Sequence, residues 1–341
     1  MIKRITAFLS AAVMSLSLCS CAYFEKQVTK KESLPAPPKL VFMGDSIAAG
    51  YGLEGYSKED LYNCESYANI LKKQYTKDLE KTVGHEMVNV AVSGETSQDL
   101  LDHLTGNDFD KALDGSDAVV ISIGGNDLLH IFLSFLMENL NFDRETGNID
   151  MEDAGLMDYI GIAAAVKDMD NEIDEALEKF DENITRIVAE INKKTEARVY
   201  VQTLYDPLEY FSDHKILADF AKSKIDRFNE IISENAQEEN GTDYSVIDLV
   251  PDFAGRSEEL TNIAQYDIHP NAEGHKLISK IVDRALQKDK YFYYVKDTVK
   301  DQAKINRFII IAASCVVVLI LGIVLAVWII KHKKSNNSER N

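Results

Sequence analysis

The stretch LVFMGDS at residues 40–46 is the part of this 341-residue chain that says most about its fold. Residues 40–43 form a continuous apolar run, which is typical of a strand buried on both faces of a parallel sheet. The run ends at Gly44, and the polar residues Asp45 and Ser46 follow directly. Because ligands of open parallel sheets bind beyond the C-terminal ends of the strands, Ser46 lies where a functional site is expected.

Four more apolar runs of this kind follow along the chain, with predicted helices between them. The predicted strands cover residues 87–92, 118–123, 198–204 and 244–249, and the predicted helices cover residues 65–79, 97–104, 128–140, 168–193, 211–236 and 271–287. Asn271 is a suitable N-cap for the last of these helices. Apolar strands that alternate with helices predict an α/β fold, in which a parallel five-stranded sheet carries helices on both faces.

Residues after the other predicted strands complete the parts of a serine esterase site. Ser46 supplies an oxygen nucleophile, which needs a neighbouring base because a serine hydroxyl is weakly nucleophilic at its ordinary pKa. His269, after the fifth strand, can accept that proton. The oxyanion that forms needs fixed donors. The backbone N–H groups of Ser46 and Gly94 and the side-chain amide of Asn126 are predicted to provide this oxyanion hole.

In these motifs the sequence resembles the SGNH/GDSL hydrolases. The four signature positions occur in order at Ser46 in GDS, Gly94 after VS, Asn126 in GGND and His269 in HPN, and the resemblance covers residues 39–287. It implies a three-layer α/β/α, flavodoxin-like fold. It also implies hydrolysis of carboxylic esters through an acyl-serine intermediate, with no metal and no other cofactor.

The acid that would orient His269 departs from the family pattern. The family acid often lies three residues before the histidine, and this chain has Tyr266 there. Asp267, only two residues before His269, is predicted to take the role, with the loop bent differently. The alternative is a Ser–His dyad in which a backbone carbonyl or a water molecule holds His269.

Two other functions compete with the esterase hypothesis. A metal-dependent phosphoesterase also uses Asp, Asn and His after strands, but it needs further ligands such as a G-H-x-H pair. Residues 274–277 read GHKL and lack the second histidine. A catalytically inactive binding or sensor ectodomain would suit a membrane anchor, although the intact set of Ser46, Asn126 and His269 argues against it.

Charge and cysteine content exclude other classes of function. The chain has 56 acidic and 37 basic residues, and the resulting net charge of −19 repels nucleic-acid phosphates. Cys64 is the one cysteine between the apolar ends, so neither an intramolecular disulfide nor a cysteine zinc site is expected there. The expected partners are an ester substrate and a membrane.

Both ends of the chain carry membrane signals. Residues 1–21 have the basic start, short apolar core and small-residue end of a signal peptide. Their end also resembles a lipobox that would acylate Cys21, and an ordinary cleaved signal is the alternative. Residues 308–330 form an uncharged run that as a helix is roughly 35 Å long, enough to span a hydrocarbon core of roughly 30 Å. The cationic residues 331–341 predict a cytoplasmic tail and place the catalytic part outside the cell membrane.

Three segments lie between these signals: a linker at residues 22–38, a hydrolase domain at residues 39–290 and a juxtamembrane stalk at residues 291–307. Residues 141–165 are acidic and lack a strand pattern, so we expect an insertion that forms either a lid or a solvated decoration. The only tryptophan is Trp328, in the predicted membrane span. Without a tryptophan platform for sugars, we expect lipid-like, small acyl or acetyl esters, with acylated glycans as an alternative.

The predicted topology can be tested on intact cells that express the chain with a tag after Asn341. Protease added outside should digest residues 39–290 and leave the tag intact, because the cationic tail stays in the cytoplasm. Lysed cells, in which both parts are accessible, provide the control. A tag that is digested on sealed cells would contradict the orientation.

Overall fold

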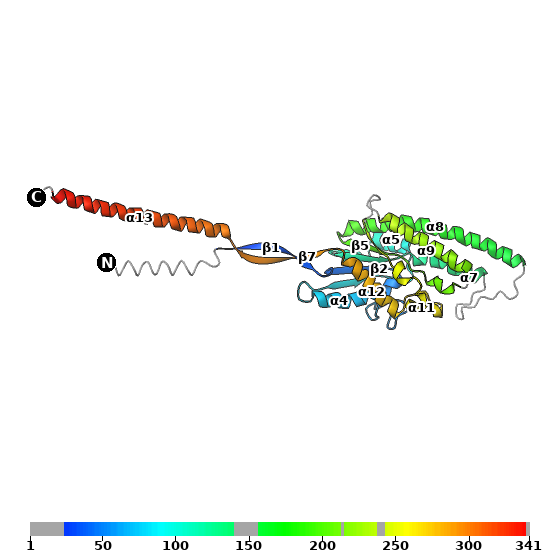
Figure 1. The fold of residues 1–341 in the computed structure, drawn as a ribbon. Coiled ribbons are helices and arrows are strands. Elements are labelled where there is room, and N and C mark those ends of the chain that lie inside the picture. Colours follow the sequence, from blue (N-terminus) through cyan, green and yellow to red (C-terminus); the bar gives the residue numbers. More distant parts are fainter. Residues whose placement is uncertain (1–23, 140–155, 213–214, 237–242, 339–341) are drawn as a thin grey trace. The chain divides into compact units, whose positions relative to one another are not determined.

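The computed structural model describes residues 24–139, 156–212, 215–236 and 243–338 (Figure 1). The chain forms two compact units. The first, Ser33–Tyr291, contains the elements predicted around Ser46. The second combines the described residues that precede this unit with those that follow it, and each unit is described by itself.

The sheet of the first unit has five strands in the order β3-β2-β4-β5-β6. These strands are β2 (Lys39–Gly44), β3 (Glu86–Asn89), β4 (Ala118–Ser122), β5 (Arg198–Gln202) and β6 (Ser245–Ile247). Every pairing is parallel, and Val41 in the central strand is in register with Val88 on one side and Val119 on the other. The predicted five-stranded parallel sheet is therefore confirmed, and all strands end at the same edge.

Helices cover both faces of the sheet, which confirms the three-layer α/β/α architecture (Figure 1). On one side lie α4 (Tyr67–Leu79) and α12 (Ala272–Leu286), and on the other lie α5 (Ser97–Thr105), α7 (Gly125–Asn139), α8 (Leu156–Lys194) and α9 (Lys215–Asn235). Side chains of β2 alternate between the layers. Val41 and Met43 join the core formed with α5 and α8, whereas the Phe42 ring packs edge-on against Tyr67 of α4, with ring centroids 5.4 Å apart.

Short helices form much of the connecting chain. They are α3 (Ser46–Ala49), α6 (Asp110–Leu113), η1 (Pro207–Phe211), α10 (Val250–Phe253), α11 (Ser257–Leu260) and η3 (Ile263–Gln265). The strands β3, β4, β5 and β6 are each shorter than the sequence predicted. β3 ends at Asn89, but the N–H groups of Val90 and Val92 still donate to the Phe42 and Gly44 carbonyls at 2.9 and 2.7 Å, so the chain stays beside β2 beyond that point.

The helix α8 is longer than the sequence predicted. It begins at Leu156 rather than Asp168, so the end of the expected insertion at residues 141–165 belongs to this helix. Its first residues include Leu, Met and several Ala, which have high helix propensity. Such residues can extend a helix toward its N-terminus without a separate helix-start motif in the sequence. Residues 140–155, the remainder of the expected insertion, lie outside the described part of the chain.

The second unit contains a two-stranded sheet and a long helix. Strands β1 (Glu25–Leu34) and β7 (Tyr291–Lys300) pair with each other, in segments that were predicted from the sequence to be a linker and a juxtamembrane stalk. Lys30 forms an ion pair with Asp297, and the Tyr293 hydroxyl donates to Glu32 at 3.0 Å, so the strands run antiparallel. The helix α13 (Gln302–Ser338) contains the predicted span, and its segment Gln302–Ile329 is long and apolar enough to cross a membrane.

A tight turn ends β2 and places Ser46. Gly44 has a φ of +112°, and a Cβ atom at this position would lie 1.8 Å from the Ser122 carbonyl oxygen of β4. Neither the backbone angle nor the space admits a side chain. The turn therefore requires glycine.

Gly44→Ala should lower the free energy of unfolding by more than about 3 kcal/mol or prevent folding, because the clash is with rigid backbone. Gly115→Ala is the matched control, since Gly115 also has a positive φ, +64°, but a Cβ there has nothing within 4 Å. That control should lose only about 1 kcal/mol. Thermal unfolding by circular dichroism measures both, and equal losses would contradict the steric explanation.

Candidate active site

Ser46 is the first residue of α3 and lies at the C-terminal edge of the sheet. The preceding Asp45 fixes this turn on both sides. Its backbone N–H donates to the Ser122 carbonyl at 2.8 Å, and its carboxylate accepts from the Ile47 N–H at 3.0 Å and from the Ser122 hydroxyl at 3.1 Å. The backbone on both sides of Ser46 is therefore fixed, and the Ser46 hydroxyl remains available for a hydrogen bond with a neighbouring side chain.

His269 and Asp267 lie beside this hydroxyl in a line of hydrogen bonds. His269 Nε2 is 2.9 Å from Ser46 Oγ, and His269 Nδ1 is 2.5 Å from Asp267 Oδ1. The same carboxylate oxygen accepts from the His269 backbone N–H at 3.0 Å. Although Asp267 is only two residues before His269, it can thus reach His269 Nδ1. The loop bends at Tyr266, which has a left-handed φ of +58°.

The electrostatics of Asp267 favour its charged form. Burial alone would raise the pKa of this carboxyl, but hydrogen bonds from the His269 ring and backbone, the charge of His269 and the Asn262 amide outweigh burial. The pKa of Asp267 is therefore held below its usual value. An ionised Asp267 can stabilise a positive charge on His269.

Gly94 and Asn126 follow the two strands that flank β2. Gly94 has a φ of +92°, and the Asn126 side-chain amide donates to the Glu95 carbonyl at 2.8 Å. Asp127 accepts from the Ser97 backbone N–H at 2.9 Å and from its hydroxyl at 2.5 Å. Residues 126 and 127 thus clamp the loop that contains Gly94. Asp127 thereby accepts the N–H of the first residue of α5, whose N-cap is Thr96.

Two backbone amides and one side-chain amide at this edge of the sheet each have an N–H group that is free to donate. Among the residues that the structure describes, the backbone N–H groups of Ser46 and Gly94 donate no hydrogen bond. The primary amide of Asn126 has a second N–H besides the one bonded to Glu95. These are the three donors that the sequence assigns to an oxyanion hole.

Glu95, which the sequence did not single out, is a buried carboxyl next to Gly94. The residue is 3% exposed, and within the described ranges its carboxyl oxygens have no hydrogen-bond partner. The nearest ring nitrogen, His103 Nε2, lies 3.4 Å from Oε1. Burial, with smaller effects of the charges on Asp99 and Asp45, raises its pKa to about 8. Burial likewise raises the pKa of Asp45 to about 7, against the opposing hydrogen bonds from Ile47 and Ser122.

Other aromatic and histidine residues complete the surroundings. The Tyr51 ring, 40% exposed, lies 4.6 Å from the His269 ring between centroids, a contact that local sequence could not reveal.

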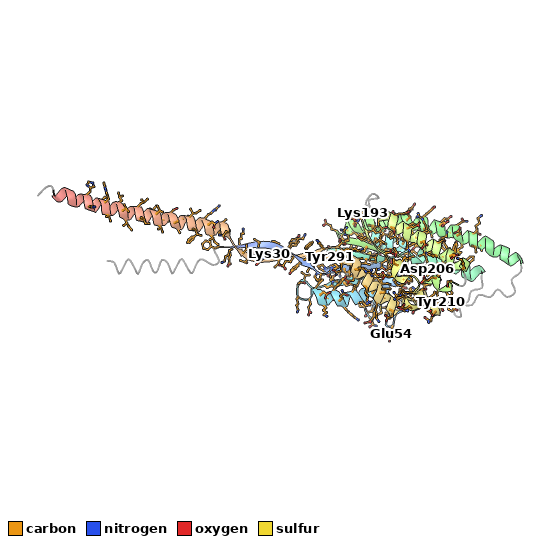
Figure 2. The ribbon with its side chains drawn as sticks, viewed as in Figure 1. Lys30, Glu54, Lys193, Asp206, Tyr210 and Tyr291 are labelled. Atoms are coloured by element: carbon orange, nitrogen blue, oxygen red, sulfur yellow. The ribbon has the colours of Figure 1, made fainter. Side chains whose placement is uncertain are left out.

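His275 is fully buried and accepts from the Tyr67 N–H at 3.2 Å, and burial lowers its pKa to about 3. His275 is therefore a neutral structural residue. Asp206 and Tyr210, which follow β5, lie on the side of the unit away from Tyr291 (Figure 2).

No group of three or more His, Cys, Asp or Glu side chains in the described part of the chain is arranged to hold a metal ion. Four apolar residues of α7 contribute to the core. Leu128 and Phe135 are buried in it, and Ile131 and Phe132 pack against it.

Comparisons with known proteins agree with this architecture. A model of the GDSL-like lipase/acylhydrolase family matches residues 42–277, more than half of the chain. The uncharacterised protein YpmR of Bacillus subtilis is 23% identical over 299 residues, which cover 84% of this chain and 97% of that protein. A lipase from a goat rumen metagenome has 19% identity and a TM-score of 0.51, with 72% of this chain and 96% of the lipase covered. An extracellular lipase from Streptomyces rimosus has 20% identity and the same TM-score, with coverages of 72% and 99%. These two structures share the fold.

The raised pKa of Glu95 predicts a pH-dependent stability. A carboxyl whose pKa is higher in the folded state, here about 8 instead of 4.5, stabilises the fold fully only at low pH. This contribution is lost as the pH rises from about 4.5 through about 8. Glu95→Gln should therefore gain stability relative to the wild type between pH 5 and pH 8, by more than about 1 kcal/mol.

Urea unfolding of the detergent-solubilised chain at both pH values measures this difference. Glu54→Gln is the control, because Glu54 is exposed at the surface (Figure 2) and should follow the wild type at both pH values. Parallel pH profiles of the wild type and Glu95→Gln would contradict the assignment of a buried neutral carboxyl.

Proposed function

Because the chain belongs to the GDSL-like lipase/acylhydrolase family, we propose that it is a serine esterase whose nucleophile is Ser46. The observation that carries this proposal is the line of contacts from Ser46 Oγ to His269 Nε2, at 2.9 Å, and from His269 Nδ1 to Asp267. A nucleophile, a base and an orienting acid in this order are what acyl transfer to serine requires.

The proposed reaction has two halves. His269 Nε2 takes the Ser46 hydroxyl proton as Oγ attacks the ester carbonyl carbon, and the carbonyl oxygen becomes an oxyanion. His269 then gives that proton to the leaving alcohol as the C–O bond breaks, which leaves an acyl-serine. A water molecule repeats the two steps, with His269 again as base and then as acid, and releases the carboxylic acid and free Ser46.

The oxyanion is proposed to accept hydrogen bonds from the backbone N–H groups of Ser46 and Gly94 and from the free N–H of Asn126. The clamp of Asn126 on Glu95 supports this role, because preorganised donors stabilise the transition state without a cost of reorganisation at the moment of reaction. Asp267 is proposed to hold His269 in the tautomer that presents Nε2 to Ser46 and to stabilise the imidazolium.

For substrate and location we propose an enzyme that acts outside the cell membrane on lipid-like, small acyl or acetyl esters. The apolar α13 supports membrane anchorage, and the exposed Tyr51 beside His269 supports access of a substrate from solvent. Lipidation of Cys21, which lies outside the described residues, would add a second anchor.

Asp267→Asn should lower kcat by about 10⁴-fold, because Asn can bond Nδ1 in a way that favours the wrong histidine tautomer. All variants are assayed on one panel of lipid-like, small acyl and acetyl esters. His269→Ala and Ser46→Ala provide the reference for complete loss of activity on this panel. Asp248→Asn is the matched control, since Asp248 also accepts the N–H of the residue two positions on, at 3.1 Å, but has no histidine partner.

The variants should be compared at equal folding by circular dichroism. A loss below about tenfold for Asp267→Asn, with His269→Ala nearly inactive, would remove Asp267 from the mechanism and favour a Ser–His dyad. Equal ester turnover by the wild type and Ser46→Ala would contradict the esterase itself.

A further inference from the structure

The loop that carries His269 is held at its middle by a residue from another strand end. Within the loop, the Asn262 N–H donates to the His269 carbonyl at 2.9 Å, and the Asp267 N–H donates to the Asn262 carbonyl at 3.3 Å. Ile268 lies between the acid and the base. Its carbonyl accepts a hydrogen bond of 2.8 Å from the hydroxyl of Tyr205, which follows β5.

Tyr205 is built as a fixed donor. Its side chain is 6% exposed, and its ring stacks on Phe253 with 4.5 Å between centroids and 18° between planes, so the ring has a settled position. Burial, with smaller effects of the charges on Asp45 and Asp267, raises the pKa of the Tyr205 hydroxyl well above its usual value. The hydroxyl therefore keeps its proton over the range in which an esterase works.

We propose that Tyr205 is a positioning residue that orients Asp267 and His269 through the carbonyl of Ile268. This proposal deepens the esterase function and rests on it. With only one residue between acid and base, the two peptide units of Ile268 set the directions of both neighbouring side chains. A rotation of the unit that carries this carbonyl would move the His269 ring relative to Asp267 Oδ1 and Ser46 Oγ together.

Such a rotation should lower kcat and leave KM nearly unchanged. A proton transfer at 2.9 Å requires alignment of Ser46 Oγ and His269 Nε2, whereas Tyr205 itself is buried behind the loop and bonds only backbone there. Tyr205→Phe removes the hydroxyl and retains the ring that stacks on Phe253. It therefore isolates the hydrogen bond.

The chain provides a matched control in Tyr244. Its side chain is 4% exposed, and its hydroxyl donates to the carbonyl of Ile232 in α9 at 2.5 Å. Tyr244→Phe thus removes a buried tyrosine–carbonyl bond of the same kind, but one that joins the residue before β6 to α9 and does not contact the loop of His269. A merely structural role for Tyr205 would make the two variants behave alike.

The experiment compares the full chain in detergent as wild type, Tyr205→Phe and Tyr244→Phe. Both variants should show similar decreases in Tm. Only Tyr205→Phe should lose kcat, by about 10- to 100-fold with KM changed less than about twofold, since small misplacements of catalytic groups cost this much. A kcat for Tyr205→Phe within about twofold of that for Tyr244→Phe would overturn the proposal.

A second readout does not depend on turnover. In the chain labelled with ¹⁵N-histidine, we expect the proton in the hydrogen bond between His269 Nδ1 and Asp267 to give a downfield NMR signal, which its loss in His269→Ala would identify. Tyr205→Phe should shift or broaden this signal, and Tyr244→Phe should leave it in place. An unchanged signal in Tyr205→Phe would overturn the positioning role, whereas a wild type that hydrolyses no ester would overturn the esterase function separately.

Discussion

The turn at Gly44 is the constraint on which the site depends. β2 lies between β3 and β4, and hydrogen bonds to both neighbours hold the turn: Gly44 accepts from Val92, and Asp45 donates to Ser122. A side chain at position 44 would enter the backbone of β4. Ser46 is thereby held at the strand edge, where the parallel sheet also brings His269 from 223 positions away.

Carboxyls with little or no exposure lie at this turn and its neighbouring loop. The buried Asp45 and the half-buried Asp127 accept hydrogen bonds from backbone N–H groups, and these bonds secure the loops that carry Ser46 and Gly94. Glu95 differs, because its carboxyl oxygens have no such partner among the described residues. Burial raises its pKa to about 8. A neutral Glu95 adds no negative charge beside the proposed oxyanion hole, where a carboxylate would oppose the developing charge.

Much of this arrangement could be predicted from the sequence, because the strands of the sheet are buried on both faces and therefore appear as continuous apolar runs. The predicted N-cap Asn271 is confirmed, and His269 lies within hydrogen-bond distance of both Ser46 and Asp267. The features that were not predicted depend on contacts between distant segments. The pairing of β1 with β7 joins segments that lie more than 250 residues apart in the sequence. Tyr205 and Glu95 acquire their surroundings only through the fold.

The central claim is that Ser46 is a nucleophile activated by His269, and covalent labelling tests it most directly. The full chain in detergent would be treated with a fluorophosphonate and analysed by intact-mass and peptide mass spectrometry, beside His269→Ala and urea-unfolded protein. The account predicts one adduct per chain, on Ser46, and at most trace labelling of the variant and the unfolded chain. An unlabelled Ser46 in the folded wild type, or labelling as fast in His269→Ala, would contradict it.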